Sequence, residues 1–396
     1  MNTEQIMKED QRHYMPVFAR YPLVLSHGEG PYVYDSEGKK YLDFLAGIAV
    51  NILGHGHPTL VKAIADQAGK MIHCSNLYYT EPQATLAARL AELTGFDRVF
   101  LANSGAEANE GALKLARKYG KTLSPDRVEI ITAENSFHGR TLATLTATGQ
   151  PKYREGYEPL PGGFSYVTYN DLDSLKRVIS DKTCAVLIEP IQGEGGVYVP
   201  DEGYLAAVRE LCDQTGALLI FDEIQTGMGR TGHLLAGQTF GVKPDIVTLA
   251  KGLGGGVPIG AFLTTDKIAS AFHAGDHGTT FGGNPLASAA GNAVLDILAG
   301  ENLAANAAAR GEYLMAELKK LQGKYPSLIK EVRGYGLMIG MELTVPGRDI
   351  INRCLEAGAI INCTAGTVLR FVPPLNITNN HIDELIVILD KALTIE

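Results

Sequence analysis

Lys251 follows a short apolar run, residues 245–250, and precedes a stretch with five glycines in residues 252–260. An amine at the end of a buried strand is desolvated, and desolvation favours its neutral form. The neutral amine is the nucleophile that Schiff-base chemistry with an aldehyde requires. The glycines would leave room for a flat ligand and for a sharply bent backbone. A surface lysine before a turn is the commoner case, but this position favours a chemical role.

Two carboxylates, Asp222 and Glu223, end another apolar run over 217–223. Because side chains alternate along a strand, one should point into the mouth of the sheet and the other away from it. A carboxylate buried there is costly unless it is paired. Its partner is either a structural cation or a bound cationic heterocycle.

A third candidate lies at the turn after residues 98–103, where Ser104 and Glu107 have the spacing of a capping box. A helix that begins there presents unpaired N–H groups at the positive end of its dipole, which suits a phosphate. This turn is neither a P-loop nor a G-x-G-x-x-G fingerprint, and no such fingerprint follows an early strand, which argues against a nicotinamide-dependent oxidoreductase. Alone, the turn indicates only a capped helix. Together, the three sites match the phosphate, ring nitrogen and aldehyde of pyridoxal phosphate.

These residues need a sheet to bring them together. Short apolar runs occupy residues 98–103, 128–134, 184–190, 217–223, 245–251 and 260–265, and residues 204–216 have helical spacing that stops at Gly216. Apolar strands alternating with helices predict an α/β fold with a mostly parallel sheet covered on both faces. Ligands of such sheets bind at the carboxyl ends of the strands, where the three sites fall.

The remainder of the chain has an α+β pattern. Residues 30–45 predict a hairpin, residues 302–322 a long amphipathic helix, and a closing helix begins at about 380. We therefore expect a large cofactor-binding domain over 51–285 and a small C-terminal α+β domain over 286–396. The N-terminal segment, 1–50, is expected to pack with the small domain.

Composition excludes several classes of protein. The 396 residues carry a net charge of −9 without a basic cluster, so nucleic acid is not an expected partner. No apolar run has transmembrane length, so no membrane association is expected. The five cysteines are widely spaced and show no metal-binding pattern, so no metal site is expected. Their odd number and spacing fit a reducing compartment, so a cytoplasmic location is expected.

Six motifs carry a resemblance to a known family. They read SGAEANE (104–110), FHGRT (137–141), EPIQGEGGV (189–197), FDEIQTGMGRTG (221–232), TLAKGLGGGVPIGA (248–261) and HGTTFGGNP (277–285). In this order they resemble the class III, fold-type I, pyridoxal-phosphate aminotransferases, over about residues 15–390. The resemblance implies a large domain with a mostly parallel central sheet, a smaller α+β domain, and an obligate homodimer with shared active sites.

The resemblance also implies which residues hold pyridoxal phosphate. Lys251 would bond to its aldehyde and later move the proton between the substrate Cα and the cofactor. Asp222 would keep the pyridine nitrogen protonated. The other implied contacts are Gln225 at the phenolic oxygen, Phe137 on the ring face, Gly105 and Ala106 at the phosphate, and Thr280 at the phosphate of the neighbouring subunit.

For the substrate, the resemblance points to Arg140 and Arg370, whose guanidinium groups suit carboxylates. Structural ion pairing is the alternative for either arginine. Two arginines would hold the two carboxylates of glutamate or 2-oxoglutarate, and Glu194 would pair with Arg370 when the substrate has only one. Thr279 is the fourth expected substrate contact. Glu189 is interpreted as structural support.

Residues 47–58, 75–83, 147–164 and 369–378 resemble the family members that act on acetylornithine. The expected reaction transfers the δ-amino group of N2-acetylornithine to 2-oxoglutarate, in arginine biosynthesis. Succinylornithine, N-succinyl-diaminopimelate, ornithine and 4-aminobutyrate are the alternative substrates. Phe18 and Ile48 stand where ornithine aminotransferases carry tyrosines, which favours an acylated donor. A cofactor-free regulatory protein is the alternative outside enzymes, and the intact lysine, aspartate and phosphate turn argue against it.

Overall fold

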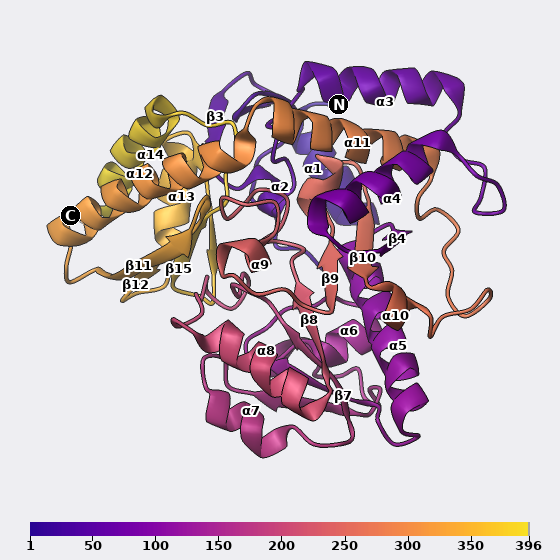
Figure 1. Cartoon of the computed structure of the whole chain (residues 1–396). Coiled ribbons are helices and arrows are strands. Elements are labelled where there is room, and N and C mark those ends of the chain that lie inside the picture. The colour runs from indigo at the N-terminus through magenta and orange to yellow at the C-terminus, as the bar shows by residue number, and fades with distance from the viewer. Residues whose placement is uncertain (395–396) are drawn as a thin grey trace.

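The computed structural model describes residues 1–394, so the last two residues of the expected C-terminal domain, 395–396, lie outside it. A seven-stranded sheet with the order β4-β10-β9-β8-β7-β5-β6 occupies the centre of the fold (Figure 1). The strands are Arg98–Ala102 (β4), Glu129–Ala133 (β5), Phe164–Val167 (β6), Thr183–Ile188 (β7), Leu218–Asp222 (β8), Ile246–Leu249 (β9) and Gly260–Thr264 (β10). Strands β9, β8, β7, β5 and β6 pair in parallel, and β10 runs antiparallel to β9 and β4. The expected mostly parallel sheet is confirmed.

Helices cover both faces of this sheet. Every residue of β7, β8, β9 and β10 is buried, as the continuous apolar runs require. Along β8, Ile220 packs in one cluster with Leu115 of α5 (Gly105–Leu123), whereas Leu219 and Phe221 pack in another with Val208 of α8 (Tyr204–Thr215). The alternation of side chains along the strand therefore places α5 and α8 on opposite faces.

Local signals account for most of these boundaries. Helix α8 ends at Gly216, which has a φ of 70° and so adopts the left-handed conformation that glycine accepts without strain. Strand β6 was not expected from the sequence. It lies at the edge of the sheet and only Val167 in it is buried, so its apolar signal is weak.

Two smaller sheets gather the ends of the chain. One has the order β1-β2-β3-β13, and the other β11-β12-β15-β14. Their strands are Leu25–Glu29 (β1), Tyr32–Asp35 (β2), Lys40–Asp43 (β3), Ile329–Tyr335 (β11), Met338–Leu343 (β12), Ala359–Ile360 (β13), Asn362–Thr364 (β14) and Val368–Phe371 (β15). The hairpin β2–β3 is present as expected, and β3 pairs in parallel with β13. We propose on this basis that segment 1–50 belongs with the C-terminal domain.

Three helices lie with the C-terminal strands at the left of Figure 1, and α11 crosses above the central sheet. The three helices are α12 (Leu303–Lys324), α13 (Arg348–Glu356) and α14 (Asn379–Leu393). The crossing helix α11 spans Pro285–Gly300. Helix α11 packs against α3 and α4, and α12 packs against β11. The chain therefore passes between the two groups of elements near residues 285–303, where we propose the domain boundary.

The remaining elements are short helices and helices of the N-terminal half. They are α1 (Thr3–His13), α2 (Ala46–Ala49), α3 (Pro58–Lys70), α4 (Glu81–Thr94), α6 (Leu142–Ala147), α7 (Leu172–Val178), α9 (Ala236–Thr239), α10 (Asp266–Ala269) and the 3₁₀ turns η1 (Pro151–Tyr153) and η2 (Lys251–Gly254). Within residues 1–394, no helix is both long enough and apolar enough to cross a bilayer.

Candidate active site

A cavity of about 440 Å³ opens where the strands of the central sheet end. Its walls come from the segments that directly follow β4, β5, β7, β8 and β9. Eight of the expected site residues line it: Gly105, Ala106, Phe137, Arg140, Glu194, Asp222, Gln225 and Lys251. The parallel strands thus bring to one place residues from five separate segments, as this type of sheet does for its ligands.

Lys251 lies two residues beyond the end of β9, and its backbone adopts a left-handed φ of 42°. No hydrogen bond or ion pair holds its amine within residues 1–394. Burial lowers the pKa of Lys251, and the Arg370 guanidinium acts in the same direction, whereas Glu194 and Asp222 oppose the shift. The neutral, nucleophilic amine is therefore more available here than in water.

The glycines after Lys251 serve the packing of the chain more than the ligand. A Cβ on Gly260 would lie 2.3 Å from the Ser104 carbonyl oxygen, and one on Gly254 would lie 2.8 Å from a methyl of Ile259. Only Gly256, with a φ of 119°, lines the cavity. The expectation that all these glycines clear space for a flat ligand is therefore wrong for most of them, because neighbouring chain already fills that space.

Asp222, the last residue of β8, is buried and faces the cavity. Its Oδ2 accepts hydrogen bonds from Asn109 Nδ2 and from His138 Nδ1, each at 2.8 Å, and its Oδ1 accepts from the Ile224 N–H at 3.1 Å. Glu223 points the other way and accepts from the N–H groups at the start of α9. The predicted opposite orientation of the two carboxylates is confirmed.

Asn109 and His138 are site residues that the sequence analysis did not single out. Both are buried, and both lie inside motifs that carried the resemblance. Asn109 also donates to the His138 carbonyl oxygen at 2.8 Å, so the two residues form one support for Asp222. Their place inside these motifs was the available signal, but their common target was not visible in the sequence.

The helix α5 begins at the cavity. Ser104 caps it, because its hydroxyl accepts from the Glu107 N–H at 3.2 Å. Glu107 does not return the bond to Ser104; its carboxylate accepts from the backbone and side-chain N–H groups of Asn103. The N–H groups of Gly105 and Ala106 have no acceptor within the described chain, and they lie at the positive end of a long helix. This arrangement suits a phosphate.

Arg370 on β15 is fully buried behind the cavity. Its Nη1 forms an ion pair with Glu194 at 2.6 Å and donates to Gln225 Oε1 at 3.2 Å. Burial alone would raise the pKa of Glu194, but the Arg370 guanidinium outweighs it and holds that pKa below its usual value. The Nη2 of Arg370 has no acceptor in the structure that spans 1–394, so the guanidinium has capacity for a further oxygen ligand.

Arg140 differs from Arg370, since it forms no ion pair in the part of the chain described. Its guanidinium carbon lies 4.1 Å from the centroid of the Tyr153 ring and 5.5 Å from that of Phe137. Arg140 is therefore an exposed cation held by two aromatic faces at the cavity mouth. Tyr153 is a third residue that the sequence analysis did not single out.

Glu189 lines the cavity but binds to backbone. It accepts hydrogen bonds from the N–H groups of Phe137, at 3.1 Å, and of Gly193, at 3.2 Å. Burial raises the pKa of Glu189 to about 7. Its contacts join the loops that carry Phe137 and Glu194, in agreement with its interpretation as structural support.

Thr279 and Thr280 lie outside this cavity. Thr279 accepts a hydrogen bond from Asn103 Nδ2 at 3.0 Å, and Thr280 is exposed on the same loop. Phe18 and Ile48, the two positions that bear on donor choice, do not line the cavity either and are exposed. The structure of one chain therefore does not bring these four residues to the lysine.

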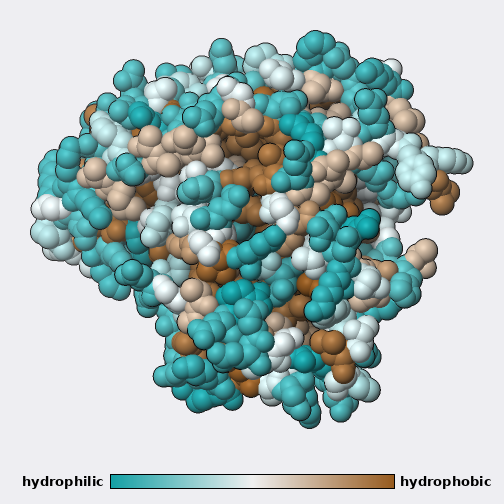
Figure 2. All heavy atoms as spheres, viewed as in Figure 1, coloured by the Kyte–Doolittle hydropathy of each residue, from teal (hydrophilic) through white to brown (hydrophobic). Residues whose placement is uncertain are grey.

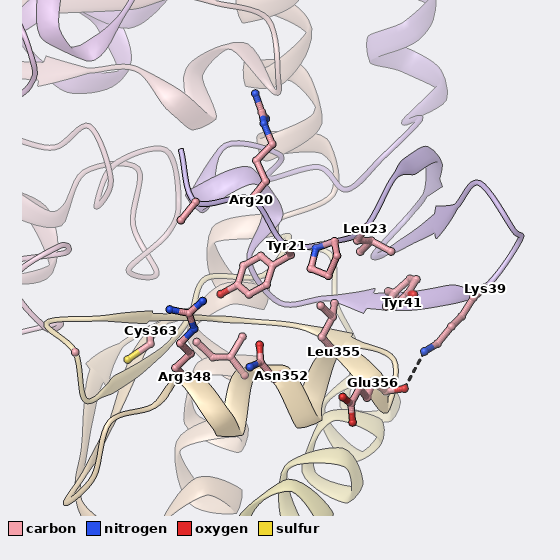
Figure 3. A pocket seen from close by; sticks show the side chains of 14 residues that line it. Arg20, Tyr21, Leu23, Lys39, Tyr41, Arg348, Asn352, Leu355, Glu356 and Cys363 are labelled. Atoms are coloured by element: carbon pink, nitrogen blue, oxygen red, sulfur yellow. Dashed lines mark hydrogen bonds between the residues drawn. The ribbon is translucent and has the colours of Figure 1, made fainter. Parts of the chain in front are cut away.

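A larger cleft, of about 740 Å³, lies elsewhere, between residues 19–23 and α13 (Figure 3). Arg20, Lys39 and Arg348 line it, and Lys39 donates to the Glu356 carbonyl oxygen at 2.8 Å. None of the expected site residues lines this cleft. Size alone therefore does not identify the site, whereas the lysine, the carboxylate and the helix start do.

The residues of the smaller cavity fit pyridoxal phosphate. The group needs an amine for its aldehyde, a carboxylate for its ring nitrogen and donors for its phosphate. Lys251 offers an unpaired amine of lowered pKa, Asp222 a carboxylate oriented by three donors, and the start of α5 two free N–H groups. The fold and this site together define a fold-type I, pyridoxal-phosphate-dependent enzyme.

Comparison with known proteins identifies the kind of enzyme. The model of the class III aminotransferases matches residues 14–393, and the chain belongs to this family. It is therefore a pyridoxal-phosphate-dependent transaminase. It is 54% identical over 395 residues to an acetylornithine aminotransferase of Methanocaldococcus jannaschii, covering 100% of this chain and 99% of that one. A second acetylornithine aminotransferase, from Methanothermobacter thermautotrophicus, is 50% identical with full coverage of both chains.

Solved structures agree in fold. An ornithine aminotransferase from Toxoplasma gondii superposes with a TM-score of 0.95 at 37% identity, covering 99% of this chain and 95% of that chain. An acetylornithine aminotransferase from Elizabethkingia anophelis superposes with a TM-score of 0.89 at 36% identity and 99% coverage of both. The structural neighbours thus include enzymes with both donors, so fold similarity alone does not select the donor.

Proposed function

We propose that the enzyme transfers the δ-amino group of N2-acetyl-L-ornithine to 2-oxoglutarate, giving N-acetyl-L-glutamate 5-semialdehyde and L-glutamate. The ion pair between Arg370 and Glu194, beside the free Arg140, is the observation that carries this proposal. Glutamate brings two carboxylates, and acetylornithine brings one. Arg370 can bind the second carboxylate of glutamate when Glu194 moves away, and it stays paired with Glu194 when acetylornithine is bound. One cavity therefore accommodates both substrates. The names of the relatives support this donor, and with it a cytoplasmic role in arginine biosynthesis.

Pyridoxal phosphate supplies, when bound, an aldehyde that exchanges amino groups and a protonated pyridine ring that withdraws electrons from the substrate. Lys251 would hold the aldehyde carbon of the bound cofactor, and its amine would move the proton at the reacting substrate carbon. Asp222 keeps a proton on the ring nitrogen. The remaining contacts are those of Gln225 at the phenolic oxygen, Phe137 on the ring face, and Gly105 and Ala106 at the phosphate.

The substrate side uses the two arginines in turn. Arg140 receives the carboxylate that each substrate has in common. Arg370 receives the second carboxylate of 2-oxoglutarate after Glu194 has moved away, and it is neutralised by Glu194 when acetylornithine is bound. Aromatic contacts from Phe137 and Tyr153 hold the Arg140 guanidinium in place without neutralising it, so its charge stays available to the substrate.

A panel of donors with 2-oxoglutarate as the acceptor tests the proposed function. The panel contains N2-acetylornithine, N2-succinylornithine, N-succinyl-diaminopimelate, ornithine and 4-aminobutyrate. We expect the highest kcat/KM for acetylornithine, the substrate in the names of the relatives, and a value about tenfold or more lower for ornithine. A preference for ornithine or 4-aminobutyrate would exclude acetylornithine as the principal donor.

Glu194→Gln, measured in the separate half-reactions with acetylornithine and with glutamate, tests the switch. Without Glu194, the buried Arg370 keeps an uncompensated charge, which disfavours a monocarboxylate and favours a dicarboxylate. We expect the ratio of kcat/KM for glutamate to that for acetylornithine to rise about tenfold. An unchanged ratio would show that Glu194 does not govern the choice between the substrates.

We also propose a homodimer with shared sites. The loops at residues 71–80 and 276–284 are joined, because Asn76 donates to the carbonyl oxygens of Thr279 and Gly282. They expose large apolar side chains: Leu77 at 82%, Tyr79 at 103% and Phe281 at 60%. Apolar residues project at the edge where these loops lie (Figure 2). Such exposure favours an interface between subunits, and Thr280 on the second loop would then reach the partner's phosphate.

Heterodimers test this arrangement. Thr280→Ala should weaken cofactor binding about tenfold, because it removes a hydrogen bond to a charged group. We expect a heterodimer of one Lys251→Ala and one Thr280→Ala subunit to regain one intact site and about half of the wild-type activity at limiting cofactor. The wild-type dimer and the two homodimeric variants are the controls. If the heterodimer is no more active than half of the Thr280→Ala homodimer, Thr280 does not serve the partner's site.

A further inference from the structure

Arg230 is a buried cation that the mechanism above does not use. It is 1% exposed, and it forms no ion pair anywhere in residues 1–394. Burial lowers the pKa of Arg230 to about 9, so the group still carries its proton at neutral pH. A buried charge without a counter-ion destabilises the folded state. An apolar residue of similar size would not have this cost. A specific set of contacts has to account for an arginine at this position.

The contacts of Arg230 join two distant parts of the chain. Its Nη1 donates to the Leu337 carbonyl oxygen at 2.9 Å and to the Pro373 carbonyl oxygen at 2.6 Å. Its own carbonyl oxygen accepts from the Leu337 N–H at 3.0 Å. Leu337 lies in the turn between β11 and β12, and Pro373 follows β15 by two residues. One side chain therefore ties the loop after β8 to two strands of the C-terminal sheet.

Both ends of this tie carry active-site residues. Gln225 lies five residues before Arg230 in the same loop, and Arg370 lies three residues before Pro373. The contact of 3.2 Å between Gln225 Oε1 and Arg370 Nη1 crosses the same junction. The loop itself has little regular structure, with φ values of 57° at Met228 and 89° at Gly229. Its place relative to β15 therefore depends on long-range contacts, namely the backbone bond between Leu337 and Arg230 and the bonds of the Arg230 side chain.

We infer that Arg230 is a positioning residue that sets the place of Arg370 and Gln225 relative to each other, and thereby the affinity for the second carboxylate of the substrate. The inference rests on the proposed role of Arg370 as a carboxylate ligand. The Nη1 atom of Arg230 alone donates to both carbonyl oxygens, which lie on different segments. A lysine amine sits on a shorter side chain and reaches these oxygens less well, and an apolar side chain cannot bind them at all. Packing alone would accept methionine here.

Calorimetric titration of glutarate into the holoenzyme tests the inference, because glutarate has both carboxylates of the substrate but no amino or keto group to react. Arg230→Met should weaken glutarate binding about tenfold or more, since a displaced Arg370 would lose a charge-assisted hydrogen bond to the carboxylate. Arg230→Lys should lie between the wild type and Arg230→Met. Arg370→Met is the control that removes the carboxylate site itself.

Arg209→Met is the matched control for general destabilisation. Arg209 is partly buried on α8, outside the cavity, and the substitution removes its two ion pairs, to Asp213 and Asp245. Wild-type affinity in Arg230→Met, or an equal loss in Arg209→Met, overturns the inference. If Arg230→Met does not fold, Arg230→Lys decides: binding about threefold or more weaker supports the inference, and unchanged binding overturns it. If Arg370→Met binds glutarate as the wild type does, the proposed carboxylate site is wrong, and the inference fails with it.

Discussion

Lys251→Ala is expected to lower kcat by about 10⁴-fold or more, since it removes both the nucleophile and the proton carrier at the reacting carbon. The same substitution should abolish covalent attachment of the cofactor. Borohydride reduction of the wild type should fix the cofactor to Lys251, which mass spectrometry of the tryptic peptides detects. The unpaired amine of lowered pKa is the structural basis of this expectation.

Lys243→Ala is the control for Lys251→Ala. The Lys243 amine donates to the Gly95 carbonyl oxygen on the surface and has no contact with the cavity. Its loss should leave both the activity and the covalent attachment unchanged. If reduction still attaches the cofactor to the Lys251→Ala protein, another lysine is the attachment point and the assignment is wrong.

Asp222→Asn is expected to lower kcat by about 10²–10³-fold, the range found when one preorganised electrostatic group is removed from an active site. The carboxylate accepts hydrogen bonds at Oδ2 from both Asn109 and His138. The amide NH₂ group of an asparagine would face these two N–H donors and could not accept from them. The ring nitrogen would also lose its anionic partner. Steady-state kinetics together with the pH dependence of the cofactor absorbance would measure both effects.

Glu223→Gln makes the same chemical change one residue along the chain and is the matched control. Glu223 points away from the cavity and holds the N–H groups of Ala236 and Gly237. We expect this variant to have a lower Tm and kcat within about tenfold of the wild type. Equal losses of kcat in the two variants would mean that Asp222 acts through stability and not through the ring nitrogen.

The sequence was sufficient to predict the central sheet because its signals are local. Buried parallel strands appear as short apolar runs, and Gly216 marks the end of α8 through a conformation that depends on one residue. The alternation along a strand likewise predicted the opposite directions of Asp222 and Glu223. Strand β6 escaped prediction because an edge strand with one buried residue leaves little pattern.

The supports of the candidate site were not predictable in the same way. Asn109 and His138 meet Asp222 from 113 and 84 residues away, and Glu194 meets Arg370 from 176 residues away. Which distant segments meet depends on the order of strands in the sheet, and no local period encodes that order. The glycines after Lys251 are a further example, since the atoms that require them belong to segments such as Ser104, far away in the sequence.

The sequence by itself thus determined the chemical groups and the strand ends that carry them: an amine, a carboxylate and a helix start. Only the tertiary structure decided the partners of those groups, and with them that Arg370 is neutralised by Glu194 while Arg140 stays free. It also decided that Arg230, among the residues up to 394, has carbonyl oxygens and no carboxylate as its ligands. The physical reason is that backbone geometry is set by near neighbours, whereas the charge and burial of a side chain depend on everything that packs around it.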